Sequence, residues 1–307
     1  MSGAPHVTVL MASYNGRDWL PAQVDSLFAQ THENWSLQVS DDGSVDGTRD
    51  LLDVLSAEHP GRIAWQPGPG RGAAQNFLAL VRDLPEAPGW IAFADQDDVW
   101  FPDKIERGVA ALKGEAGPAL YCSVTRIAEA DLTPREVSDA RPRPLGFRNA
   151  LVQNVVAGNT ILVNPAAARL LRQAAQRTGE VVMHDWWVYL LLSGAGAALH
   201  HDTEPGLLYR QHGGNEVGAN KGARARLMRV GMILTGRYKQ WTDTNMAWLR
   251  SVEDLLTEEN RALMEEFDRM RAGPLSVRSR LVDRLGLYRQ TRLSTQALRL
   301  AAALGRI

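Results

Sequence analysis

Three carboxylates fall within four residues at Asp95-Gln96-Asp97-Asp98. Like charges this close repel one another, so such a run is stable only where water or a cation neutralises it. Hard divalent ions such as Mg²⁺ prefer carboxylate oxygens together with substrate phosphates. The run therefore predicts a site for a metal and a diphosphate. One alternative stays open: an exposed acidic turn that caps a helix beginning near Pro102, with Asp98 or Asp103 at its start.

A second candidate for chemistry is His184-Asp185-Trp186-Trp187. A carboxylate beside two tryptophans at the start of a helix could act as a general base in a partly apolar pocket. The tryptophans would then offer an aromatic surface to a sugar ring. The sequence alone also allows a plainer interpretation, in which Asp185 caps the helix and both tryptophans belong to the core.

Three weaker polar groups complete the set. Asp41-Asp42-Gly43-Ser44 and Ser13-Tyr14-Asn15 could hold a nucleobase or a ribose, or could be ordinary turns. Arg71, in a glycine-rich loop, could meet a phosphate or simply be solvated. His212, before Gly213, could present its imidazole to a metal or a diphosphate, although a histidine near a turn is more often structural.

The elements that must position these groups alternate between strand and helix. Apolar runs predict strands over 6–13, 35–40, 62–65 and 90–94, and the segments between them predict helices over 20–28, 49–55 and 73–81. This alternation indicates a mostly parallel α/β sheet flanked by helices. Ligands bind outside the carboxyl ends of the strands in such sheets, where Ser13, Asp41 and Asp95 all fall.

The second half of the chain is less regular. Residues 131–144 are rich in proline and charge and indicate a loop, whereas helices are expected from about Pro165 and over 184–192. A last strand is expected over 207–212, and the pattern is helical from about Arg224 onward. We therefore divide the chain into a catalytic domain over 1–219 and a helical C-terminal extension over 220–307.

Composition excludes several classes of protein. The 307 residues carry a net charge of −1 and a single cysteine, Cys122, so an internal disulfide framework is impossible. No signal peptide is visible, and no run of about 18 apolar residues predicts a spanning helix. A cytoplasmic protein is expected, with no nucleic acid as partner.

Charge is unevenly distributed along the chain. Residues 220–307 hold 17 basic and 9 acidic side chains, so the extension is strongly basic while the rest is acidic. Near the end, Leu293, Ala297, Leu300 and Leu304 form a narrow apolar stripe, with arginines on a neighbouring face. Such a helix suits the anionic inner face of a cell membrane, or packing on the catalytic domain or on another subunit of a homo-oligomer.

The motifs taken in order resemble the family 2 glycosyltransferases with a GT-A fold. The match runs from about residue 7 to 219 and includes the segments 7–16, 40–48, 71–77, 93–100, 158–160, 184–187 and 209–215. The last four include Asp-Gln-Asp-Asp-Val-Trp, His-Asp-Trp-Trp and Tyr-Arg-Gln-His-Gly-Gly-Asn. This combination is most similar to the bacterial rhamnosyltransferases that use dTDP-L-rhamnose, although related branches use UDP-sugars.

The resemblance implies a role for each matching residue. Ser13 and Asp41 would hold the nucleobase and Asp42 would lie near the base or ribose. Asp95 would lie nearer the ribose, and Asp97 would ligate Mg²⁺ or Mn²⁺. The other implied roles are Tyr14, Asn15, Arg71 and Gln96 as further donor contacts, His212 as a metal or diphosphate contact, Asp185 as the catalytic base, and His184, Trp186 and Trp187 as the acceptor or sugar pocket.

Together these expectations describe an inverting, metal-dependent glycosyltransferase. It would move rhamnose to a glycan or lipid-linked acceptor of a bacterial surface polysaccharide. Many relatives carry Glu-Asp where this chain has His184-Asp185, so the base assignment depends on Asp185 alone. The alternatives are a UDP-sugar-dependent enzyme of the same fold, a non-catalytic sugar-nucleotide-binding partner in an assembly, and a nucleotidyltransferase.

Overall fold

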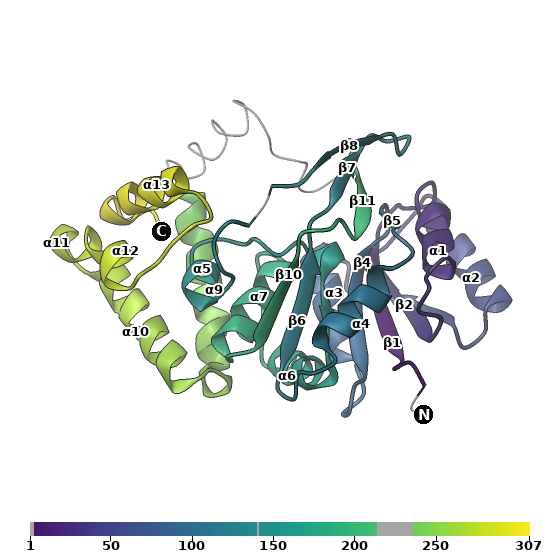
Figure 1. Ribbon diagram of the computed structural model, residues 1–307, viewed down its shortest axis with the longest axis horizontal. Coiled ribbons are helices and arrows are strands. Elements are labelled where there is room, and N and C mark those ends of the chain that lie inside the picture. Colours follow the sequence, from purple (N-terminus) through teal and green to yellow (C-terminus); the bar gives the residue numbers. More distant parts are fainter. Residues whose placement is uncertain (1–2, 140, 214–235) are drawn as a thin grey trace.

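A seven-stranded sheet organises the molecule (Figure 1). The computed structural model describes residues 3–139, 141–213 and 236–307. In spatial order the strands are β10 (Ala198–Asp202), β6 (Ala119–Ser123), β9 (Leu162–Val163), β4 (Trp90–Asp95), β1 (Val7–Ser13), β2 (Trp35–Asp41) and β3 (Ile63–Pro67). Only β9 runs antiparallel to its neighbours. The expected mostly parallel α/β sheet is therefore confirmed. The four strands predicted over 6–13, 35–40, 62–65 and 90–94 are confirmed as β1 to β4.

Helices cover both faces of this sheet. Strand β1 shows why, because Val7, Val9 and Met11 enter one apolar core while Leu10 enters the other. The first core is closed by α1 (Leu20–Phe28), α2 (Thr48–Glu58) and α4 (Lys104–Leu112). The second is closed by α3 (Ala73–Arg82), α6 (Pro165–Ala175) and α7 (His184–Gly194). The predicted helices over 20–28, 49–55, 73–81 and 184–192, and the one from about Pro165, are confirmed.

A second, four-stranded sheet lies beside the first. Its order is β5 (Val99–Trp100), β11 (Leu207–Arg210), β7 (Arg126–Ala128) and β8 (Pro134–Val137). The prediction of a continuous loop over 131–144 is wrong, because β8 lies within it and pairs with β7. Three of the four residues of β8 are exposed, so the segment carries no alternation of apolar and polar residues that would mark a strand.

The remaining described helices form the C-terminal end of the molecule. These are α9 (Arg237–Ser251), α10 (Glu258–Ala272), α11 (Leu275–Arg278), α12 (Leu281–Arg284) and α13 (Arg292–Ala303), with α5 (Phe147–Ala150) beside them. Their buried residues Phe267 and Leu298 belong to the same apolar cluster as Phe93 of β4. The predicted boundary at 219 lies outside the described residues. Among the described helices, none is both long and apolar enough to cross a membrane.

Candidate active site

The carboxyl ends of β1, β2 and β4 bring the predicted polar groups to one edge of the main sheet. In the strand register, Ser13 of β1 lies opposite Asp41 of β2, and Ala12 lies opposite Asp95 of β4. Parallel pairing aligns the ends of strands that are far apart in the sequence. The polar residues that end β1, β2 and β4 therefore lie along one edge of the sheet.

Asp41 is fully buried, and its carboxylate is saturated within the protein. It accepts hydrogen bonds from the side chains of Ser13 at 3.0 Å, Ser44 and Arg49, the last at 2.7 Å, and from the backbone N–H groups of Gly43 and Ser44. Burial raises the pKa of Asp41, but the bonds from Ser44 and Arg49 outweigh it and hold the value below normal. Ser13 is only 2% exposed. In this structure both side chains therefore order the turn after β2, and their contact with the nucleobase stays a prediction.

Asp42, one residue later, holds the glycine-rich loop. Its two carboxylate oxygens accept hydrogen bonds from the backbone N–H groups of Gly70 at 2.7 Å and Gly72 at 2.6 Å. Arg71, between these glycines, forms an exposed ion pair of 2.8 Å with Glu180. Exposed pairs of this kind are weak, so Arg71 is free to exchange its partner for a phosphate.

Gln96 fastens the loop after β1 to the acidic run. Its side-chain amide accepts from Tyr14 N and donates to Tyr14 O, both at 2.9 Å. A Cβ at Gly16 would lie 2.0 Å from Oε1 of Gln96, so a larger residue there would displace the Gln96 amide. Asn15 has a φ of 46° and accepts a bond from the backbone N–H of Val45. The prediction that Gln96 binds the donor stays a prediction. In this structure its amide bonds to the backbone of Tyr14, whose own side chain is 57% exposed.

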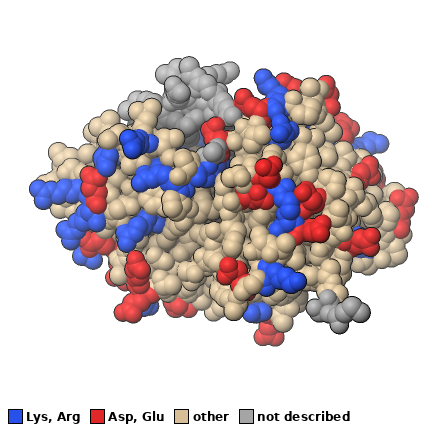
Figure 2. Space-filling model, in the orientation of Figure 1, with Lys and Arg blue, Asp and Glu red and all other residues tan. Residues whose placement is uncertain are grey.

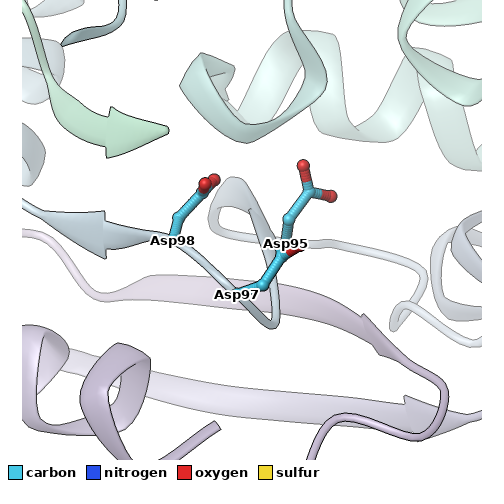
Figure 3. Close-up of side chains that lie close together, drawn as sticks. All are labelled: Asp95, Asp97 and Asp98. Carbon is cyan, nitrogen blue, oxygen red and sulfur yellow. The ribbon is translucent and has the colours of Figure 1, made fainter. Parts of the chain in front are cut away.

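The acidic run forms a cluster suited to a divalent cation. Oxygen atoms of Asp95, Asp97 and Asp98 all lie within 4.8 Å of one another, and Figure 3 shows the carboxylates of Asp95 and Asp98 pointing to the same side of the loop. Nε2 of His212 lies 2.8 Å from Oδ2 of Asp97. One oxygen of Asp98 is buried without a hydrogen-bond partner among the described residues. Carboxylates plus an imidazole are ligands that fit Mg²⁺ or Mn²⁺.

Asp98 is a buried member of this cluster. Its side chain is inaccessible to solvent and accepts a 2.5 Å bond from Nδ2 of Asn159. Burial, and then the charges of Asp95 and Asp97, raise the pKa of Asp98 well above its ordinary value. The alternative of an exposed acidic cap fails for Asp98, which is buried; Asp103 does occupy the N-cap of α4, although its side chain makes no capping bond.

A buried lysine, Lys104, lies close enough to the cluster for its charge to interact with that of Asp98. Lys104 is 2% exposed, and its Nζ lies 3.2 Å from the centre of the Trp100 ring. Burial lowers the pKa of Lys104 to about 7, against the opposing charge of Asp98. Sequence reasoning missed Lys104, since one lysine at the start of a helix gives no signal of burial.

Strand β11 brings His212 to the acidic run. The His212 ring stacks on Trp19 with centroids 4.7 Å apart and an angle of 19° between the rings. Arg210 donates to the backbone oxygen of Asp97 at 2.9 Å and lies over the same tryptophan. The structure therefore places His212 beside Asp97 as expected, and it adds Trp19 and Arg210, to which the sequence assigned no role.

Asp185 lies in the first turn of α7. Its Oδ1 accepts a 2.7 Å hydrogen bond from the backbone N–H of Trp186, and the polar groups of Asn154 and Gly158 nearby also lower its pKa. Burial outweighs these effects and raises the pKa of Asp185 to about 6. A carboxylate with such a pKa is well suited to accept a proton near neutral pH.

The neighbours of Asp185 have a structural role, which corrects the predicted sugar pocket. Trp186 and Trp187 are 2% and 1% exposed, and their ring N–H groups donate to Ala150 O at 2.7 Å and to Thr178 Oγ1 at 3.2 Å. Every residue from 186 to 194 is buried, so α7 has no side on which a ligand could contact either ring. The simpler alternative, two core tryptophans, is correct.

His184 also packs inside the protein. Its ring stacks on Phe77 with centroids 3.9 Å apart, and a Cβ on Gly158 would lie 2.3 Å from its Nε2. Burial lowers the pKa of His184 to about 3, so the ring is neutral. His184 therefore positions α7 against Gly158 and carries no charge into the site.

One short turn connects the acidic cluster to Asp185. In the 3₁₀ turn Gly158–Thr160, Gly158 packs against Asp185, since an added Cβ there would lie 3.4 Å from Cβ of Asp185, while the next residue, Asn159, donates a hydrogen bond to Asp98. The sequence had shown this turn only as a polar interruption in an apolar run. It brings the candidate base and the candidate metal cluster to neighbouring residues of one rigid segment.

Comparisons with known proteins agree with this geometry. The chain is 27% identical to the dTDP-rhamnosyl transferase RfbG of Shigella flexneri, over 75% of this chain and 81% of the relative. It is 28% identical to the putative teichuronic acid biosynthesis glycosyltransferase TuaG of Bacillus subtilis, over 62% and 73%. A solved structure of S. aureus TarS 1-349 with UDP-GlcNAc covers 98% of this chain with a TM-score of 0.56 at 13% identity, using 90% of its own length.

The family model described as glycosyl transferase family 2 matches residues 8–177, more than half of the chain. That span contains the carboxyl edges of β1, β2 and β4, the acidic cluster and the turn at Gly158–Thr160. On this evidence the chain belongs to glycosyl transferase family 2.

Proposed function

We propose that the protein transfers L-rhamnose from dTDP-L-rhamnose, with inversion, to a glycan or lipid-linked acceptor of a bacterial surface polysaccharide. The observation that carries the reaction is the turn Gly158–Thr160, in which Gly158 packs against Asp185 and the adjacent Asn159 donates a hydrogen bond to Asp98. The donor assignment is supported by the relative named as a dTDP-rhamnosyl transferase, which aligns with 75% of this chain. A glucosyltransferase of Escherichia coli named for UDP-Glc aligns with only 34%.

A divalent ion, Mg²⁺ or Mn²⁺, held by Asp95, Asp97 and His212 would supply positive charge beside the leaving diphosphate. In this proposal Asp98 and Asn159 set the position of the acidic loop, and Gln96 holds Tyr14 against it. Tyr14, Asn15, Asp42 and Arg71 lie along the same edge and are proposed to contact the nucleotide.

Asp185 is proposed as the general base. Its carboxylate would accept the proton of the acceptor hydroxyl while the hydroxyl oxygen forms a bond to the anomeric carbon. The bond between that carbon and the diphosphate oxygen breaks, so dTDP leaves with its charge. Neutral His184 and the polar groups of Asn154 and Gly158 would fix the direction of the carboxylate.

The deciding experiment is a donor screen by calorimetry in the presence of Mn²⁺, followed by analysis of the released nucleotide. We expect tighter binding of dTDP-rhamnose than of UDP-glucose or UDP-GlcNAc, with release of dTDP. Preference for a UDP-sugar would support the alternative donor class. Binding with no turnover in the presence of any acceptor would instead support a non-catalytic assembly partner. Release of pyrophosphate when the protein is given dTTP and a sugar 1-phosphate in place of the donor would indicate a nucleotidyltransferase.

A further inference from the structure

The last described helix leaves a row of leucines uncovered. Leu293 and Leu300 of α13 are 76% and 63% exposed, and Leu304 at its C-cap is 55% exposed. Positions separated by seven and then four residues lie on one side of a helix, so the three side chains form a continuous line. We call these three residues the leucine stripe. Leu275 of the neighbouring α11 is 59% exposed as well.

Packing on the described part of the protein does not explain the leucine stripe. The opposite side of α13 is the buried one, through Thr295, Leu298, Ala301 and Ala302. The capping box between Thr291 and Ser294 starts the helix without using the stripe. The helix therefore already has its protein contact, and the leucines are an additional apolar surface.

The segment that carries this apolar surface is rich in arginine. Residues 275–307 contain seven arginines and one acidic residue, Asp283, so their side chains carry a net charge of +6. Arg280, Arg292 and Arg306 are exposed and form no ion pair with any described residue. Figure 2 shows basic side chains gathered over the end of the molecule that carries α11 and α12.

The positive charge of this segment favours an anionic bilayer over a second copy of the chain as the partner of the leucine stripe. A second copy of the chain would bring two sets of arginines together, which is unfavourable. Three leucine side chains also provide little of the roughly 800 Å² per partner that a stable protein interface buries. An anionic bilayer satisfies both features, because its headgroups neutralise the arginines while its acyl boundary accepts the leucines.

We propose that the leucine stripe and the arginines of the same segment dock the protein on an anionic lipid bilayer. The contact is peripheral, with α13 lying in the plane of the headgroups. The proposal concerns residues of α13 that have no part in the candidate active site, and it does not depend on which sugar is transferred. If the acceptor is lipid-linked, which is part of the proposed function, the same contact would bring the active site to its substrate.

The test is flotation of the full-length protein with vesicles of phosphatidylglycerol and phosphatidylcholine, and with phosphatidylcholine alone. We expect binding only to the anionic vesicles and release by high salt. Leu300→Ser should weaken binding roughly tenfold. The triple serine variant, in which Leu293, Leu300 and Leu304 are all replaced by serine, should not bind. The matched control is Val54→Ser on α2, which is 51% exposed and should bind like the wild type.

A second variant separates charge from apolar contact. Replacing Arg280, Arg292 and Arg306 by glutamine should weaken binding on the order of a hundredfold. Circular dichroism and donor hydrolysis in solution should be unchanged in every variant, which makes failure of docking distinguishable from failure of the enzyme. Equal flotation of wild type and the triple serine variant would overturn the proposal, as would a dimer in solution that the serine variant converts to monomers.

Discussion

At the scale of single residues, Asp185 provides the sharpest test of mechanism. Its pKa of about 6 means that the proton-accepting form increases as the pH rises through that value. We expect kcat/KM to fall about tenfold per pH unit below pH 6 and to level off above it. Asp185→Asn should keep donor binding and reduce transfer by at least about a hundredfold.

Steady-state rates over a pH series and calorimetry with the donor check this expectation. The control is Asp50→Asn, an exposed carboxylate in the first turn of α2, which should leave both quantities unchanged. An Asp185→Asn variant with normal turnover would remove Asp185 from the mechanism.

The same raised pKa also affects the stability of the fold. Whereas kcat/KM should rise with pH, the contribution of Asp185 to stability should fall. Between its ordinary value of 3.8 and about 6, the folded protein keeps a proton on Asp185 that the unfolded chain has released. This contribution to stability is fully present below pH 3.8 and is lost as the pH rises through 6. Without metal or donor, the melting temperature of Asp185→Asn should therefore decrease less than that of the wild type over this window.

Asp97 carries the prediction for metal. It combines a hydrogen bond to His212 with two neighbouring carboxylates, so it is the residue at which a cation would meet most ligands. Asp97→Asn should remove the Mn²⁺ dependence of donor binding and weaken that binding at least about tenfold. Calorimetry with and without Mn²⁺ measures this. Donor binding by Asp97→Asn that still increases with Mn²⁺ would place the ion elsewhere.

At the scale of elements, the turn Gly158–Thr160 should be intolerant of added volume. A Cβ on Gly158 would lie 2.3 Å from Nε2 of His184, a ring already stacked on Phe77. Gly158→Ala should therefore displace α7 and lower the free energy of unfolding by about 1–3 kcal/mol. Transfer should also slow, because Asp185 moves with the helix.

The matched control is Gly179→Ala, where an added Cβ meets nothing within 4 Å. Chemical denaturation of both variants gives the comparison. Equal stability of the two would show that His184 moves aside at no cost and that the turn is not a rigid link.

The elements also show what the sequence could and could not reveal. Strands β1, β2 and β4 were predictable because each is a short apolar run that ends in a polar turn. The tryptophans of α7 were ambiguous, because a residue suited to stacking on a sugar is equally suited to a core. The bond from Asn159 to Asp98 was not predictable, since it joins residues 61 positions apart and depends on tertiary packing.

At the scale of the whole molecule, the predicted catalytic domain and C-terminal extension share one apolar core. One apolar cluster includes Phe93 of the main sheet, Trp187 of α7, Phe267 of α10 and Leu298 of α13. A cluster shared in this way should unfold as one unit. We therefore expect a single calorimetric transition in which the C-terminal helices and the catalytic region melt together.

Two leucines of α13 test this cooperativity, because they share a helix and differ in burial. Leu298 is 3% exposed and Leu300 is 63% exposed. Leu298→Ala should destabilise the entire protein by about 2–5 kcal/mol through the cavity it leaves. Leu300→Ala should change stability by less than about 0.5 kcal/mol.

If the extension were an independent domain, Leu298→Ala would shift only a second, separate transition and would leave the melting of the donor site unchanged. A single transition that moves as a whole would instead mean that the basic C-terminal helices are part of the catalytic fold, so that a contact made by their outer surface is held rigidly relative to Asp185.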